Sequence, residues 1–210
     1  MLDQLSFKGQ WRQYQQRVLD KSESFMDDGK IHLVAAPGSG KTTLGIEFIR
    51  RFGNPTLILV PTVTIQQWVD RIKQAFLSDA NQAEQLISQD LKRPKMITVA
   101  TYQALHSAMN QVVGYGLIED TDDTAQQEHF NFQDFDIRKT FEDKDLGTLC
   151  LDECHHLRNE WWKSLEIFRK SFPKIKMISL TATPPYEGEP ALWERYISMC
   201  GEIDEEITVP

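Results

Sequence analysis

Short apolar runs alternate along the chain with longer segments in which apolar residues recur every three or four positions. Runs that are apolar almost throughout are typical of parallel strands buried on both faces, and they cover residues 31–34, 56–60, 96–100, 148–151 and 175–180. The periodic segments predict amphipathic helices over residues 10–26, 43–52, 63–76, 159–172 and 189–199, and another helix that starts at Thr101. Strands that alternate with helices predict an α/β fold, with a mostly parallel sheet and helices on both of its faces.

Two stretches depart from this alternation. Residues 78–95 are polar and predict a short helix and a turn. Residues 112–146 combine an acidic run with several phenylalanines, and a structureless loop of that length would be unusual inside a compact domain. We therefore expect an acidic insertion there with some structure of its own, which is a candidate docking site for a protein partner.

The acidity of the chain is concentrated in this insertion. The formal net charge is −8, which by itself argues against a nucleic-acid partner, because phosphate binding uses clustered Lys and Arg. Ten of the 31 acidic residues but only three of the 23 basic residues lie between Glu119 and Asp145, so the rest of the chain is close to neutral. Net charge therefore does not decide whether the partner is a nucleic acid.

Length and composition favour one soluble α/β domain. The 210 residues, 40% of them hydrophobic and 26% charged, suffice for one sizeable core. No window approaches ~18 consecutive apolar residues, so we expect no membrane span, and the N-terminus lacks the basic-then-apolar order of a secretory signal. The three cysteines imply no disulfide framework, and together these features predict a cytoplasmic protein.

A metal-binding alternative involves Cys150, Cys154, His155 and His156. Their spacing is not one of the usual tetrahedral zinc sets, and the sequence offers no second ligand pair. We expect a buried strand cysteine and a loop cysteine instead.

The clearest chemical signal is the segment that joins the first strand to the following helix. It reads Ala-Ala-Pro-Gly-Ser-Gly-Lys-Thr over residues 35–42. In a phosphate-binding loop, backbone N–H groups and the positive end of the next helix face an anion. Gly38 and Gly40 allow the backbone to approach that anion closely. Lys41 would then reach the β- and γ-phosphates of a nucleotide, and the hydroxyl of Thr42 would ligate Mg²⁺.

Residue chemistry adds three candidate site residues to this loop. An amide side chain offers a donor and an acceptor that match the adenine edge, so Gln15 in the preceding helix is the candidate adenine reader. Asp152 and Glu153 come directly after a buried strand. There Asp152 would hold the metal, and Glu153 would be the general base that polarises the attacking water.

Five strand ends carry polar or catalytic residue types. Because the carboxyl ends of parallel strands meet at one edge of a sheet, these residues should converge on one crevice. They are residues 38–42, 61–62, 101, 152–153 and 181–183.

The order of these motifs resembles that of the first motor lobe of superfamily 2 helicases and translocases, which are RecA-like ATPases with a DExH-type second motif. The matching segments are APGSGKT, VPT with a downstream QQW, TYQAL, DECHH and LTATP. The resemblance covers nearly the whole chain and implies a three-layer RecA-like P-loop domain. DECH with TATP is more similar to DNA-directed translocases and restriction-type helicase subunits than to the RNA-remodelling DEAD-box group.

The resemblance also implies the roles of individual residues, most of which lie at or beside a strand end. The implied groups are nucleotide binding (Arg12, Gln15, Pro37, Gly38, Ser39, Gly40, Lys41, Thr42 and Thr43), catalysis (Lys41 and Glu153), Mg²⁺ binding (Thr42 and Asp152), coupling of the nucleotide state to the polynucleotide (His155, Thr181 and Thr183) and polynucleotide contact (Pro61, Thr62 and Thr101).

The resemblance divides the chain into three parts. Residues 1–30 would be a helical adenine-recognition element, residues 31–201 the ATP-binding domain, and residues 202–210 a connector toward a second RecA-like lobe that is absent here. In related phosphoryl-transfer sites an arginine finger, which the second lobe would supply, is worth about 10³ to 10⁵ in rate. We therefore expect this chain alone to bind ATP with Mg²⁺, to hydrolyse it barely and not to unwind duplexes.

Two alternatives to a nucleic-acid motor use the same loop. A nucleotide-dependent switch would dock a protein partner through the acidic insertion without translocating, and continuation of the reading frame into another α/β domain would argue against it. A small-molecule kinase would need several arginines in a lid after the loop helix, where the sequence has only Arg50 and Arg51.

Overall fold

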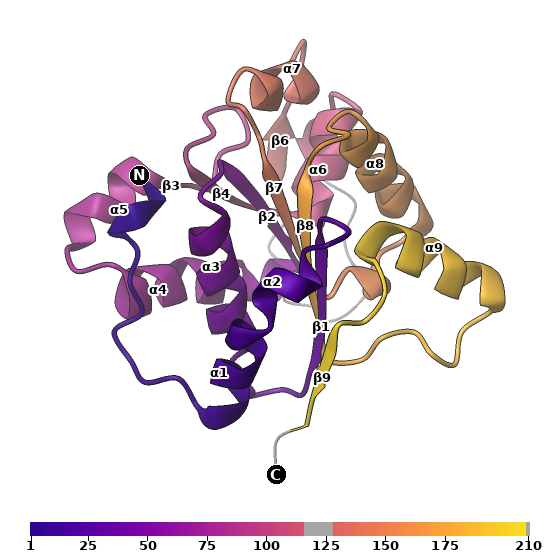
Figure 1. Ribbon diagram of the computed structural model, residues 1–210. Coiled ribbons are helices and arrows are strands. Elements are labelled where there is room, and N and C mark those ends of the chain that lie inside the picture. The colour runs from indigo at the N-terminus through magenta and orange to yellow at the C-terminus, as the bar shows by residue number, and fades with distance from the viewer. Residues whose placement is uncertain (116–127, 209–210) are drawn as a thin grey trace.

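The computed structural model describes residues 1–115 and 128–208, and a seven-stranded parallel sheet lies at its centre (Figure 1). The strand order is β3-β4-β2-β7-β8-β1-β9, and every neighbouring pair runs parallel. The strands are β1 (Lys30–Ala35), β2 (Thr56–Val60), β3 (Ile87–Ser88), β4 (Ile97–Thr101), β7 (Thr148–Asp152), β8 (Lys176–Thr181) and β9 (Glu205–Ile207). The predicted α/β class with a parallel sheet is confirmed.

Helices cover both faces of this sheet. They are α1 (Gln13–Asp20), α2 (Ser22–Phe25), α3 (Lys41–Phe52), α4 (Ile65–Phe76), α5 (Ala80–Leu86), α6 (Tyr102–Met109), α7 (Ile137–Glu142), α8 (Asn159–Lys170) and α9 (Pro190–Cys200), with short 3-10 turns η1 (Leu2–Gln4), η2 (Thr62–Thr64) and η3 (Cys154–His156). Figure 1 shows α1, α3 and α4 on one side of the sheet and α6, α8 and α9 on the other.

Each face of the sheet has its own apolar core. Alternate residues of β2 point to opposite faces, and Ile58 and Val60 pack with α3 and α4 whereas Leu57 and Leu59 pack with α6 and α8. The molecule is therefore a three-layer domain of helices, sheet and helices.

The five predicted strands are all present, within one residue of the expected bounds at each end. The apolar pattern missed β3 and β9, because these strands have only two and three residues. β9 pairs with β1 in parallel, with Glu205 opposite Leu33 and Ile207 opposite Ala35. Part of the segment that we expected to be a connector thus forms an edge strand of the sheet.

The helix predicted over residues 10–26 is shorter and interrupted. α1 begins only at Gln13, because Arg12 is extended (φ −67°, ψ 154°) and its N–H donates to the Gln15 side chain. A turn at Lys21 separates α1 from α2. These features tie the start of the helix to the side chain of Gln15, which the periodicity of apolar residues does not reveal.

The insertion has structure of its own in its described part. β5 (Val113–Tyr115) and β6 (His129–Asn131) form an antiparallel pair. Phe130, Phe132 and Phe141 are buried in the core on the α6–α8 side of the sheet. Aromatic side chains therefore anchor this segment, while the acidic run at residues 119–123 lies outside the described residues.

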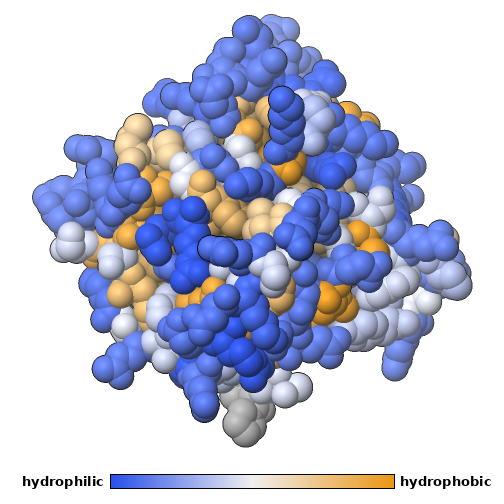
Figure 2. Space-filling model, in the orientation of Figure 1, coloured by the Kyte–Doolittle hydropathy of each residue, from blue (hydrophilic) through white to orange (hydrophobic). Residues whose placement is uncertain are grey.

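The visible surface is mostly hydrophilic, with small apolar patches between polar residues (Figure 2). Across residues 1–115 and 128–208, none of the helices combines the length and the apolar character that a bilayer crossing demands.

Candidate active site

The loop between β1 and α3 leaves the sheet at the edge where β7 and β8 also end. Because β8 lies between β1 and β7, the ends of the three strands lie side by side. Gly38 (φ +78°) and Gly40 (φ +83°) have left-handed backbone conformations, which residues with a Cβ rarely adopt. The chain can thereby turn sharply into α3, whose first residue is Lys41.

Side chains from the start of α1 hold this loop through its carbonyl oxygens. Tyr14 donates its hydroxyl proton to the Ser39 carbonyl oxygen (2.9 Å), and Gln15 Nε2 donates to the same oxygen (3.0 Å). Arg12 Nη1 donates to the Gly38 carbonyl oxygen (3.4 Å). The N-terminal element is therefore attached to the loop that we expect to bind phosphate.

Gln15 is packed tightly against the loop. It is only 6% exposed, and its Oε1 accepts the Arg12 N–H (3.0 Å). A Cβ on Gly40 would lie 2.5 Å from Gln15 Nε2, so a side chain here would displace the end of the Gln15 amide from the Ser39 carbonyl oxygen, and the positive φ of residue 40 also favours glycine. An amide retains a second N–H and a second lone pair beyond these contacts. Adenine recognition by Gln15 stays a prediction.

Lys41 joins the loop to the acidic pair after β7. Its ammonium group forms an ion pair with the Glu153 carboxylate and lies 3.8 Å from Asp152 Oδ1. Burial lowers the pKa of Lys41, and the negative charge of Asp152 opposes that shift. The three residues predicted to surround the phosphates and the metal thus converge at one point.

Asp152 places its two carboxylate oxygens in different surroundings. Oδ2 accepts a hydrogen bond from the indole Nε1 of Trp68 (2.9 Å), whereas Oδ1 is buried and has no hydrogen-bond partner. Burial raises the pKa of Asp152, while the Trp68 hydrogen bond and the charge of Lys41 act in the opposite direction.

The residues at this edge fit a divalent cation. A buried carboxylate oxygen that accepts no hydrogen bond costs free energy, and a hard cation such as Mg²⁺ prefers oxygen ligands of this kind. Asp152 Oδ1 is such an oxygen, and the hydroxyl group of Thr42, buried at the start of α3, is a second candidate ligand.

Glu153 is held in an unusual backbone conformation. Its φ is +52°, and its carboxylate accepts hydrogen bonds from the Thr181 hydroxyl (2.7 Å) and the Ala182 backbone N–H (3.1 Å). A left-handed conformation in a residue with a side chain persists only where the surroundings hold it, and such residues cluster at functional sites. The end of β8 thus fixes the position of the predicted general base.

His155 belongs to the same hydrogen-bond chain. Its Nδ1 lies 3.0 Å from Thr181 Oγ1, and its Nε2 lies 3.1 Å from Thr183 Oγ1. The Thr181 hydroxyl donates its hydrogen bond to Glu153, because a carboxylate only accepts. Its oxygen is then the acceptor for His155, so Nδ1 of His155 carries the proton and donates to Thr181. Burial, with the nearby His156 and Lys41, lowers the pKa of His155 to about 4, so the ring is neutral and Nε2 accepts from Thr183.

Pro61, Thr62 and Thr101 lie at the same edge, after β2 and at the end of β4. Thr62 is exposed, whereas Thr101 is 4% exposed and its hydroxyl oxygen accepts the Ala104 N–H (3.0 Å) as the N-cap of α6. The side chain of Thr101 therefore has a structural role, and contact of these residues with a polynucleotide stays a prediction.

Two residues of this site escaped the sequence analysis as site residues. Tyr14 and Trp68 both fall on the apolar side of an amphipathic helix and were interpreted as core aromatics. Buried Tyr and Trp usually find a hydrogen-bond partner for the hydroxyl or the indole N–H, and this was the signal that could have found them.

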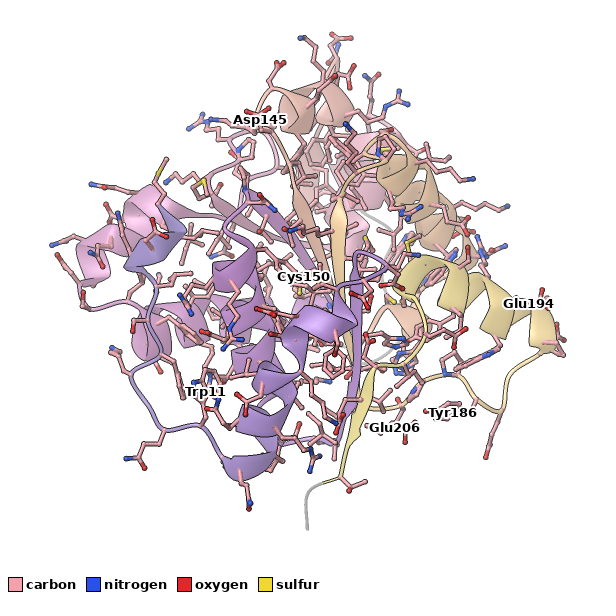
Figure 3. The ribbon with its side chains drawn as sticks, in the orientation of Figure 1. Trp11, Asp145, Cys150, Tyr186, Glu194 and Glu206 are labelled. Carbon is pink, nitrogen blue, oxygen red and sulfur yellow. The ribbon has the colours of Figure 1, made fainter. Side chains whose placement is uncertain are left out.

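The cysteines do not form a zinc site with the histidines. Cys150 is fully buried in β7, at the centre of the molecule in Figure 3, and Cys154 faces Cys200 at 3.5 Å between the sulfur atoms. Potential ligand atoms of Glu153, His155 and His156 do lie within 4.8 Å of one another. Glu153 and His155, however, already use theirs for Lys41, Thr181 and Thr183.

Comparison with known families matches residues 8–186 to the family described as Type III restriction enzyme, res subunit, and the chain belongs to that family. A putative DNA 3'-5' helicase Rad25 of Halobacterium salinarum is 28% identical over 181 residues, which cover 85% of this chain and 24% of the relative. A putative ATP-dependent RNA helicase of African swine fever virus is 40% identical over 63 residues, which cover 29% of this chain and 12% of that protein. The chain thus spans only 24% of the length of the Rad25 relative.

Solved helicase structures share the fold. The UvsW helicase from bacteriophage T4 superposes with a TM-score of 0.59 at 16% identity, over 96% of this chain and 62% of the other. The Hef helicase domain of Pyrococcus furiosus gives 0.57 at 16% identity, over 93% of this chain and 38% of the other. The expected three-layer α/β fold is therefore confirmed, and it is shared with these helicase domains.

Proposed function

We propose that this member of the type III restriction enzyme, res subunit family is the ATP-binding first motor lobe of an ATP-dependent helicase or translocase that acts on nucleic acid. The observation that carries the proposal is the contact of Lys41 with the Asp152–Glu153 pair, which joins the phosphate-binding loop to the acidic motif. Neither motif alone would indicate a nucleotide site. Lys41 follows β1, whereas the two acids follow β7, which is two strands away in the sheet, so their contact is not expected by chance.

ATP would bind over residues 38–42, where backbone N–H groups and the start of α3 favour a phosphate. Lys41 would exchange its ion pair with Glu153 for contacts to the β- and γ-phosphates. The exchange is favourable because it places the ammonium group against a multiply charged anion. The same exchange would release the Glu153 carboxylate from its ion pair with Lys41.

Glu153 would then orient the attacking water and take up its proton. The Thr181 hydroxyl and the Ala182 N–H keep the carboxylate in place during this step. Asp152 and Thr42 would hold Mg²⁺, which would supply charge neutralisation on the phosphates. His155 connects Glu153 through Thr181 to Thr183, and this chain of hydrogen bonds would transmit the nucleotide state to the segment after β8.

DNA is the favoured polynucleotide. The relative named as a DNA helicase matches 85% of this chain, whereas the relative named as an RNA helicase matches 29%. Pro61, Thr62 and the start of α6 would touch the strand backbone, since contacts to phosphates need no sequence information. A second RecA-like lobe in the same polypeptide would supply the arginine fingers, and without it ATP turnover would be very slow.

Substitution of Lys41 tests the nucleotide site. Lys41→Ala should weaken Mg-ATP binding at least tenfold in an equilibrium titration, because a hydrogen bond to a charged group contributes about 1.5–3 kcal/mol. Lys73→Ala is the matched control, since Lys73 is exposed on α4. If Lys41→Ala has the melting temperature of the wild type and binds Mg-ATP with unchanged affinity, the proposal is contradicted.

The motor and the switch differ in their response to polynucleotide. In a protein that contains both lobes, the proposal expects ATP hydrolysis to rise on addition of DNA and to rise less with RNA. A nucleotide-dependent switch would bind ATP equally well, but its hydrolysis would not respond to either polynucleotide.

A further inference from the structure

We propose that Trp68 is a positioning residue that orients the Asp152 carboxylate for the divalent cation, and this inference rests on the proposed function. The indole would hold one carboxylate oxygen permanently, so that the other is presented to the metal. Trp68 lies on α4, far from the acidic motif in sequence, and nothing in its apolar spacing assigns it a role in the site.

The geometry separates the two oxygens of Asp152. Trp68 Nε1 donates to Oδ2 at 2.9 Å, whereas Oδ1 has no hydrogen-bond partner and faces Lys41 Nζ at 3.8 Å. Trp68 is fully buried and Asp152 is 2% exposed, so bulk water does not compete for this hydrogen bond. The carboxylate is therefore held in one orientation, with Oδ1 on the side of the loop.

An indole is chemically suited to this position. It donates one hydrogen bond and has no lone pair to compete for a cation, and it carries no positive charge that would repel one. A lysine or arginine at the same place would neutralise the carboxylate and oppose metal binding through its own charge. The neutral donor satisfies one oxygen and leaves the negative charge available.

The packing leaves the indole little freedom to move. A Cβ on Gly45 of α3 would lie 3.0 Å from Trp68 Cη2 and 2.7 Å from Leu180 Cδ1, which shows how closely the ring fits against α3 and the end of β8. The Tyr102 hydroxyl donates to the backbone carbonyl oxygen of Asp152 (2.8 Å). Asp152 is thus held through its main chain from α6 and through its side chain from α4.

The competing interpretation is that Trp68 only fills the core. Trp161 provides the matched comparison within the chain, because it is also buried but its indole N–H has no hydrogen-bond partner. Replacement of either residue by Phe removes a similar volume of ring and one indole N–H. Only Trp68→Phe removes a contact to Asp152.

Nucleotide binding as a function of Mg²⁺ concentration distinguishes these roles. For Trp68→Phe we expect the Mg²⁺ concentration at half-saturation to rise about tenfold or more, since loss of a group that orients a metal ligand typically costs 10–100-fold in metal affinity. ADP affinity in EDTA should stay within twofold of the wild type, and Trp161→Phe should leave both quantities unchanged. An unchanged Mg²⁺ requirement in folded Trp68→Phe would overturn the inference.

A measurement on the wild-type protein does not depend on the variant folding. The indole N–H of Trp68, assigned by NMR, should stay protected from solvent exchange when Mg²⁺ and ADP saturate the site, because the metal uses Oδ1 and leaves Oδ2 to the indole. Loss of that protection on metal binding would contradict the division of the two oxygens. Failure of the wild type to bind nucleotide in a Mg²⁺-dependent way would instead contradict the proposed function.

Discussion

His155 is held as a neutral ring by its place in the hydrogen-bond chain. Thr181 Oγ1 accepts a hydrogen bond from Nδ1–H, and burial, together with the nearby His156 and Lys41, makes a positive charge on the ring unfavourable. A neutral ring with one donor and one acceptor can link Thr181 to Thr183, which a protonated ring with two donors cannot do in the same way. The coupling predicted for this residue therefore depends on its protonation state.

The lowered pKa of His155 can be tested by titration. Its NMR signal should titrate with a pKa of about 4, well below the ordinary value of 6.5. The unfolded chain takes up this proton near 6.5 and the folded chain only near 4, so the contribution of His155 to stability is lost as pH falls through that range. His155→Gln should flatten the pH dependence of the melting temperature between about 6.5 and 4.

The pH dependence of the melting temperature should not vanish in His155→Gln. Burial also lowers the pKa of His32, which acts in the same direction. A melting temperature whose dependence on pH is identical in His155→Gln and wild type would contradict the assignment.

The side chains that meet at the candidate site can be predicted from the sequence, but those that hold them in place cannot. Lys41, Asp152, Glu153 and His155 are recognisable by residue type and order along the chain. The hydrogen bonds of Tyr14 and Trp68 depend on which part of an aromatic ring meets which neighbour, and apolar spacing contains no such information. A helix was expected to start at Thr101, but the hydroxyl that was assigned to a polynucleotide contact accepts the Ala104 N–H as the cap of that helix.

At the scale of elements, α1 and the phosphate-binding loop behave as one unit. Arg12, Tyr14 and Gln15 all donate to carbonyl oxygens of the loop, and Gln15 occupies the space beside Gly40. The conformation of the loop therefore depends on the docking of a helix that precedes it in the sequence.

Alanine substitutions in the loop test this dependence. Gly40→Ala should lower the free energy of unfolding by more than Gly38→Ala, because both have positive φ but only residue 40 has Gln15 against it. The backbone strain alone is worth about 1–2 kcal/mol, and the difference between the two variants reports the clash. Chemical denaturation measures both values.

A double variant supplies the control. Gln15→Ala should restore part of the stability lost in Gly40→Ala, because it removes the atom that the new methyl group meets. Strictly additive effects of the two substitutions would mean that Gln15 and Gly40 do not interact.

Buried parallel strands were easy to predict because their apolar runs are continuous, but their order in the sheet was not. The two strands of the seven-stranded sheet that were not predicted, β3 and β9, show what apolar spacing cannot reveal. β9 contains two glutamates, and it is a strand because it completes the hydrogen bonds of β1 and buries Ile207, which are facts of tertiary structure.

In the molecule as a whole, ion pairs, a hydrogen bond and apolar packing all hold β9 and the residue before it against the rest of the domain. Arg17 of α1 and Lys21, in the turn after α1, form ion pairs with Glu205 (3.0 and 3.2 Å), and the Asp204 carboxylate accepts the His32 N–H (2.8 Å). Ion pairs at the surface contribute little to the free energy of unfolding, typically below about 1 kcal/mol each. Burial of Ile207 against the core is the larger contribution.

Substitution of Ile207 tests whether β9 belongs to the core of the lobe. Ile207→Ala should lower the free energy of unfolding by about 2–5 kcal/mol, the usual cost of truncating a buried isoleucine. Val63→Ala, at an 88% exposed position, should change it little. Equal stabilities of the two variants in urea denaturation would show that β9 detaches without cost.

The order of strands in the sheet has a consequence for biosynthesis. β1 leaves the ribosome early, but its neighbours are β8 and β9, which are translated close to the end of the 210 residues. Parallel strands far apart in sequence pair late, since the loop between them must close first. The nascent chain therefore carries an apolar, unpaired strand and an unsupported loop before α3 until β8 and β9 have been translated, and chaperones that bind exposed apolar segments should recognise β1 during that interval.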